Sequence, residues 1–219
     1  AVRFSNEGQW IHICSSLELA TCSLSDGQVA HSVDVDVGMA VFSRDGRTLA
    51  GVDSHAIRAW DVATGRCKAC ITWAAGEIGS IALSPDGMVI AFVLNEREVC
   101  VGNIHTQGAE QSYRFDDAIT AVTFVDDRGV VACASANGVL TLIDAARSSA
   151  LRTHRIRLRG LSHITAPPDG RVLAVATRYG IVGLVNAETG ELLVKRKVHG
   201  LWTNSLAFSP DGKYLVSAS

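Results

Sequence analysis

The sequence lacks any long apolar run, and it has few aromatic and few charged residues. Its longest nearly uniform apolar stretch, Met88–Leu94, is far shorter than the roughly 20 residues that a membrane-spanning helix needs. No basic segment followed by an apolar run stands at the start, and no Asn-x-Ser/Thr acceptor for glycosylation occurs. We therefore expect no targeting signal and no membrane span in this stretch. Hydrophobic residues still make up 47% of the 219 residues, enough for a large core.

Recognisable catalytic motifs are also missing from the sequence. It contains no Gly-x-Ser-x-Gly elbow, no phosphate-binding P-loop and no His-x-His or His-Glu-x-x-His pair, and its seven histidines are scattered. The one Cys-x-x-Cys spacing, Cys67 to Cys70, has no second pair with which to hold zinc. On an extended strand, residues three apart point to opposite faces, so we expect these two thiols to diverge. The sequence thus predicts no enzyme activity, no cofactor and no metal.

The six cysteines follow no disulfide pattern, and the net charge of −2 hides an uneven distribution. Each cysteine lies in an apolar, strand-like run, which is typical of free thiols buried as small hydrophobic groups. This predicts a reducing, intracellular location, on the cytosolic face of a membrane or in the cytoplasm or nucleus. Residues 1–109 carry 7 Lys/Arg against 12 Asp/Glu, whereas residues 110–219 carry 13 against 10. The two halves are therefore expected to face different partners, with no specific nucleic acid among them.

A turn motif that ends in glycine recurs along the whole chain. Its glycines stand at positions 8, 46, 87, 129, 170 and 212, with spacings of 38, 41, 42, 41 and 42 residues. In Ser84-Pro85-Asp86-Gly87 the proline fixes φ, the aspartate accepts hydrogen bonds from the turn backbone, and the glycine takes a positive φ. A regular period of about 40 residues indicates a repeat protein.

Each repeat predicts a small antiparallel sheet of four strands. Apolar segments precede and follow each turn, for example 40–42 and 172–176, and a third follows at 56–60 or 138–143. Second turns at Thr64-Gly65, Gln107-Gly108 and Thr189-Gly190 lead to a fourth, more polar strand. A sheet of this size cannot bury both faces alone, so neighbouring repeats must cover it.

These residues resemble the WD40 repeat. The resemblance lies in the Ser-Pro-Asp-Gly turns, in Trp60-Asp61 at the end of a third strand, and in the Ala-Phe-Ser-Pro-Asp-Gly run at 207–212. It implies an all-β fold, a WD40-type β-propeller. The family's buried Asp-His-Ser/Thr-Trp set is incomplete here: Ser54, Asn137 and Tyr179 stand at the Asp position, and Gly-His is reversed at His199-Gly200. We expect blades held mostly by apolar packing.

About five and a half four-stranded blades are expected within one incomplete propeller domain, residues 1–219. The expected blades are 1–37, 38–77, 78–117, 118–160, 161–200 and the partial blade 201–219. Rings of the resembled family usually have seven blades, so we expect the chain to be part of a larger ring.

The resemblance implies a non-catalytic scaffold or adaptor that binds other proteins within a larger complex. An alternative comes from a narrower resemblance in the last 60 residues to the ER-anchored propeller exchange factors of the small GTPase that starts COPII coats. The segments that carry it are 174–177, 188–190, 198–201 and 206–209. It implies nucleotide exchange in ER-to-Golgi vesicle formation. That family's potassium-binding loop and membrane helix are absent from the sequence, so no catalytic residue carries over.

Two rows of cations are the candidate partner-binding feature. Arg155, Arg157 and Arg159 alternate with apolar residues on a predicted fourth strand, and aligning Gly160 with Gly200 places Lys195 and Lys197 at the sites of Arg155 and Arg157. One interpretation is edge protection, because cations on an outer strand discourage strand addition. The other is a patch that binds an acidic or phosphorylated protein surface.

Three tryptophans, Trp10, Trp73 and Trp202, are the remaining candidates for partner binding. Trp202 precedes the first strand of the last repeat, where the family resemblance implies an exposed surface near the central channel. It is either an exposed hot spot or a packed core residue.

Overall fold

The computed structural model describes residues 1–5, 9–53, 56–72, 76–106, 111–146 and 149–219. These residues form two compact units. Unit 1 comprises residues 1–76, 83–90 and 102–110, and unit 2 comprises residues 77–82, 91–101 and 111–219. Within the described ranges the regular structure consists of strands, and no helix there has the length and apolar character needed to cross a membrane.

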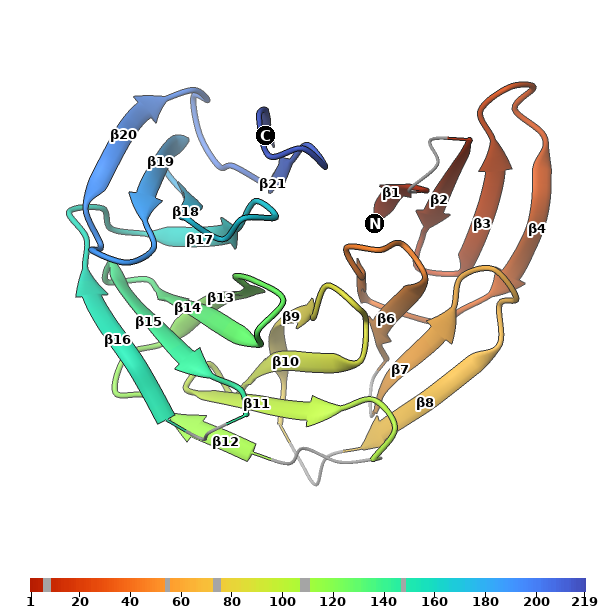
Figure 1. Cartoon of the computed structure of the whole chain (residues 1–219), viewed down its shortest axis with the longest axis horizontal. Helices are drawn as coiled ribbons and strands as arrows, with labels where there is room; N and C mark the ends of the chain where they lie inside the picture. Colours follow the sequence, from red (N-terminus) through yellow and green to blue (C-terminus); the bar gives the residue numbers. More distant parts are fainter. Residues whose placement is uncertain (6–8, 54–55, 73–75, 107–110, 147–148) are drawn as a thin grey trace. The chain divides into compact units, whose positions relative to one another are not determined.

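Unit 1 contains two antiparallel sheets of four strands, each in sequence order (Figure 1). The first sheet has β1 (Val2–Phe4), β2 (Trp10–Cys14), β3 (Glu18–Ser23) and β4 (Val29–Asp34). The second has β5 (Met39–Phe42), β6 (Thr48–Val52), β7 (Ala56–Asp61) and β8 (Cys67–Thr72). The two sheets share one apolar core, in which Leu19 and Leu49 are fully buried beside Trp60.

A third sheet, whose residues are divided between the two units, has β9 (Ile78–Leu83), β10 (Val89–Leu94), β11 (Glu98–Asn103) and β12 (Gln111–Arg114). Unit 2 adds β13 (Ile119–Phe124), β14 (Val130–Ser135), β15 (Val139–Asp144) and β16 (Ser149–Arg155). Its next sheet has β17 (Leu161–Thr165), β18 (Val172–Thr177), β19 (Ile181–Asn186) and β20 (Leu192–Lys197). The last pair is β21 (Ser205–Phe208) and β22 (Leu215–Ala218).

Within unit 2 the first strands of successive sheets are neighbours. Strand β17 lies beside both β13 and β21. Apolar side chains fill the space between the sheets, with Leu140 and Val175 fully buried among them. This repeated packing of small sheets on each other confirms the predicted all-β architecture of about five and a half blades. The prediction that they form one domain stays a prediction.

The repeated turns have the geometry that the sequence predicts. Gly46, Gly87, Gly129, Gly170 and Gly212 all have positive φ, between 62° and 84°. In the Ser-x-Asp-Gly turns the serine hydroxyl donates to the aspartate, at 2.6 Å in both Ser84–Asp86 and Ser209–Asp211. The same carboxylates accept a backbone N–H two residues further on. Three predicted features lie outside the described residues: Gly8 of the first turn, the Gln107-Gly108 turn and Ser54.

The cysteine predictions are partly wrong. Cys14, Cys100 and Cys133 are buried free thiols, as predicted, but Cys67 and Cys70 are exposed. A β-bulge in β8 pairs Cys67 with Trp60 and Cys70 with Arg58. Since those two partners are two residues apart on β7, both thiols lie on one face of the sheet, not on opposite faces.

Candidate binding surface

The three predicted arginines lie at the end of β16 and in the connection that follows it. Arg155 is the last residue of β16 and pairs with Val139, whereas Arg157 and Arg159 lie beyond the strand, which corrects the prediction that all three share it. All three side chains are exposed, while Ile156 and Leu158 between them are buried in the core. The predicted alternation therefore persists after the strand ends, because the two apolar residues anchor the connection.

Strand β20 supplies a second set of exposed cations, Lys195, Arg196 and Lys197. Lys197 pairs with Ile181, the first residue of β19, just as Arg155 pairs with Val139, the first residue of β15. Lys197 therefore occupies the position of Arg155, and the alignment of Lys195 with Arg155 is wrong by two residues. The reason is that Gly160 stands five residues after the end of β16, whereas Gly200 stands only three residues after the end of β20.

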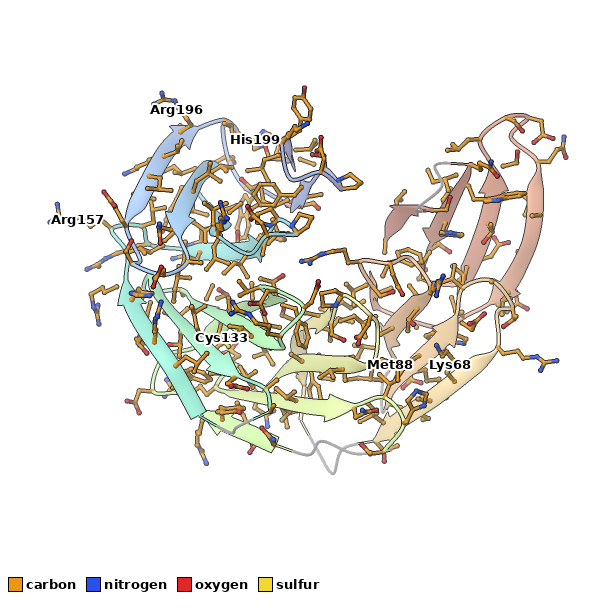
Figure 2. All side chains as sticks on the ribbon, viewed as in Figure 1. Lys68, Met88, Cys133, Arg157, Arg196 and His199 are labelled. Atoms are coloured by element: carbon orange, nitrogen blue, oxygen red, sulfur yellow. The ribbon has the colours of Figure 1, made fainter. Side chains whose placement is uncertain are left out.

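These cations have no carboxylate partner among the described residues. Arg155, Arg157, Arg159, Lys195 and Lys197 form no ion pair within that part of the chain. Other cations of unit 2 are paired, as in Arg128–Asp126 at 2.7 Å, Arg152–Glu188 at 3.6 Å and Lys213–Asp211 at 3.6 Å. The unpaired set with Arg196 is called the cationic surface below: Arg155, Arg157, Arg159, Lys195, Arg196 and Lys197. Figure 2 shows Arg157 and Arg196 pointing away from the sheets.

The hairpin between β18 and β19 adds two residues that the sequence analysis missed as binding candidates. The Arg178 guanidinium carbon lies 5.2 Å from the centre of the Tyr179 ring, and Arg178 Nε donates to the Tyr179 hydroxyl at 3.2 Å. Both side chains are exposed. The sequence contained one sign of this feature: an Arg-Tyr pair stands at a predicted hairpin, at the position where the resembled family usually has a buried aspartate.

Trp202 is exposed, with 59% of its surface accessible, and its neighbour Leu201 is 71% exposed. Trp202 is thus not packed in a core of the described residues, and its role in partner binding stays a prediction. Trp10 is half-buried in β2, and Trp73 lies outside the described residues. The connection that carries Trp202 is held to β22 by a hydrogen bond of 2.8 Å between His199 Nε2 and Ser217 Oγ.

A comparison with known families adds a finding at this end of the chain. Residues 190–219 match the family model described as WD domain, G-beta repeat. The matched segment is a WD40 repeat. Its antiparallel four-stranded sheets fit a partial WD40 propeller. No curated protein sequence matches the chain.

The WD40 repeat supports a general role as a protein-interaction scaffold. The matched segment contains Lys195, Lys197 and Trp202, so part of the candidate surface lies within a recognised repeat. In the part of the chain that the structure describes, no group of three or more His, Cys, Asp or Glu side chains is placed to hold a metal ion.

Proposed function

We propose that this WD40-repeat protein is a non-catalytic scaffold whose cationic surface docks an acidic or phosphorylated segment of a partner protein. The observation that carries the proposal is that the exposed cations of β16, β20 and the connection after β16 have no carboxylate partner within the described ranges. Cations that are not neutralised within the chain attract an anionic partner, and they speed its association.

Edge protection is the competing explanation, and the position of two arginines bears against it. A cation protects a sheet edge only where it lies on the edge strand. Arg157 and Arg159 lie past the end of β16, where no strand edge needs protection, and yet they are exposed and have no ion-pair partner among the residues described. Their placement supports a ligand-binding role for them, while Lys195 and Lys197 in β20 fit both roles.

The test measures binding of two labelled peptides to the whole chain by fluorescence anisotropy. One peptide is rich in glutamate, and the other carries phosphoserines separated by glycine and serine. The triple variant Arg155→Gln, Arg157→Gln, Lys197→Gln should weaken binding of at least one peptide about tenfold, because each exposed charge pair contributes up to about 1 kcal/mol. Added salt should weaken wild-type binding as well.

A matched control removes three charges from the same unit at residues that are already paired. Arg128→Gln, Arg171→Gln and Lys213→Gln replace cations that have Asp126, Asp169 and Asp211 as partners. This control should bind the peptides nearly as well as the wild type. Equal losses in the two variants, or no binding of either peptide by the wild type, would contradict the proposal. No described residue favours the exchange-factor alternative, which stays a prediction.

A further inference from the structure

Two free thiols lie on one exposed face of β8 in unit 1. Cys67 pairs with Trp60 on the neighbouring strand β7. Cys70 pairs with Arg58, which stands two residues before Trp60. The β-bulge therefore compresses a spacing of three residues into the length of two, which is about 6.6 Å along a strand. The register thus creates a pair of thiols that the Cys-x-x-Cys spacing alone does not.

The Cys67 side chain points along the strand toward Cys70. Its Sγ donates to the Ala69 carbonyl oxygen at 3.4 Å. That carbonyl belongs to the peptide group that joins Ala69 to Cys70, so the sulfur atom lies on the side of Cys67 that is nearer its partner. Both cysteines are exposed, and a ligand from solution can therefore reach both sulfur atoms.

Lys68 stands between the two cysteines in sequence, but its side chain runs to the other face of the sheet. Its Nζ lies 3.5 Å from Thr48 Oγ1. Thr48 pairs with Asp61, whose side chain points to the opposite face from that of its neighbour Trp60. Since the thiols share the face of Trp60, the lysine does not cover them.

The spacing of the two thiols suits a bridging ion better than a disulfide. A disulfide needs Cβ atoms about 3.8 Å apart, whereas side chains two residues apart on one face keep them about 6.6 Å apart. A metal ion held in line between two thiolates, with bonds of about 2.3 Å, separates the sulfur atoms by about 4.6 Å. Two side chains that lean toward each other reach that separation without movement of the backbone.

The donor atoms select the class of ion. Thiolates favour soft cations, among them Cu(I), Zn²⁺ and the iron of iron–sulfur clusters. Structural zinc sites and iron–sulfur clusters usually take four protein ligands, whereas Cu(I) is satisfied by two thiolates in line. Arg58 stands directly opposite Cys70, and although it pairs with Asp53 at 3.2 Å, its charge favours an anionic complex at this place.

We propose that Cys67 and Cys70 bind one Cu(I) ion between their sulfur atoms. Each thiol releases its proton to solvent and forms one Cu–S bond, so copper and sulfur keep their oxidation states and the complex carries one net negative charge. The expectation of no metal rested on thiols that diverge, and the register of β8 removes that basis. The site lies outside the cationic surface, so it is independent of the proposed function.

The experiment titrates the whole, reduced chain with Cu(I) in the absence of oxygen, in competition with the coloured chelator bicinchoninate. The wild type should take one equivalent of copper from the chelator. Cys67→Ser and Cys70→Ser should each weaken binding about a hundredfold or more, because loss of an outer-shell partner alone costs about 10–100-fold. Cys22→Ser is the matched control, since Cys22 is a half-buried free thiol of the same unit, and it should leave binding unchanged.

X-ray absorption at the copper edge and native mass spectrometry give a second readout on the wild-type chain. They should show copper bound by two sulfur atoms alone, in a complex of one chain and one ion. Nitrogen or oxygen ligands, or one ion shared between two chains, would overturn the site. No uptake of Cu(I) by the wild type, or equal losses in Cys22→Ser and Cys67→Ser, would overturn it as well.

Discussion

Gly190, in the turn between β19 and β20, lies directly against the imidazole of His154 in β16. A Cβ atom at position 190 would lie 2.6 Å from His154 Nδ1. Next to this contact, Arg152 NH1 donates to the Glu188 carbonyl oxygen at 3.2 Å. The turn of one sheet is thus fastened to the last strand of the preceding sheet, β16, which ends at Arg155 of the cationic surface.

Replacing Gly190 by alanine should destabilise unit 2 by about 2–4 kcal/mol. The φ of +72° costs an L-residue about 1–2 kcal/mol, and the added methyl overpacks the contact with His154. Denaturant unfolding measures the loss. Gly27→Ala is the control, because Gly27 has the same φ of +72° but nothing lies within 4 Å of the place that its methyl group would take. It should cost about 1 kcal/mol, and equal losses at the two sites would contradict the contact.

Replacing Glu96 by glycine should stabilise the protein by about 1 kcal/mol. Glu96 has a φ of 62° in the β10–β11 hairpin, a backbone conformation that L-residues adopt only at a cost. Glycine relieves the left-handed backbone strain of glutamate. Thermal unfolding should show a higher Tm for Glu96→Gly but not for Glu96→Ala, which removes the charge and keeps the strain. A rise in both variants would indicate that charge, not backbone conformation, is responsible.

Stability should fall as the pH drops below about 6.5, in part through His163. Burial lowers the pKa of the His163 imidazole below its ordinary value, although a hydrogen bond to the Asn204 backbone opposes the shift. The unfolded chain therefore takes up the proton at a higher pH than the folded chain, so this contribution is complete above about 6.5 and is lost below it. Unfolding free energies measured from about pH 7.5 to about pH 5 should fall less steeply in His163→Gln. An unchanged slope would rule out a contribution from this residue.

Only some of the thiols should react in the folded protein. Cys67 and Cys70 are exposed on β8, whereas burial raises the pKa of Cys100 to about 11 and raises that of Cys133 further. Because the thiolate is the reactive form, maleimide should label Cys67 and Cys70 first, and label Cys100 and Cys133 only after unfolding. Peptide mass spectrometry reads out each site. Labelling of Cys133 in the native state would contradict its burial in β14.

Local sequence was sufficient to predict the repeats, because a Ser-Pro-Asp-Gly turn is stabilised by interactions among its own residues. Ser84, Asp86 and Gly87 form their turn with hydrogen bonds to each other and to adjacent backbone. The strands on either side of such turns could be predicted from their apolar residues. This is why the fold could be predicted from residues a few positions apart.

Features that depend on pairing between strands were not predictable in the same way. The bulge that brings Cys67 and Cys70 to one face is a property of the β7–β8 register. The alignment of Gly160 with Gly200 failed because only Gly160 has a positive φ and a close packing role, while Gly200 has open space around it. Residue identity alone does not distinguish these two glycines. The contact between Arg178 and Tyr179 likewise depends on side-chain rotamers, which residue identity does not specify.

Zero-length cross-linking with a carbodiimide tests the cationic docking surface most directly. The chain has four lysines, Lys68, Lys195, Lys197 and Lys213. A bound glutamate-rich peptide should form amide cross-links to Lys195 and Lys197, which lie on the surface, and the yield should fall when Arg155 and Arg157 are replaced by glutamine. Cross-links spread equally over all four lysines, or concentrated on Lys68 or Lys213, would contradict the proposed surface.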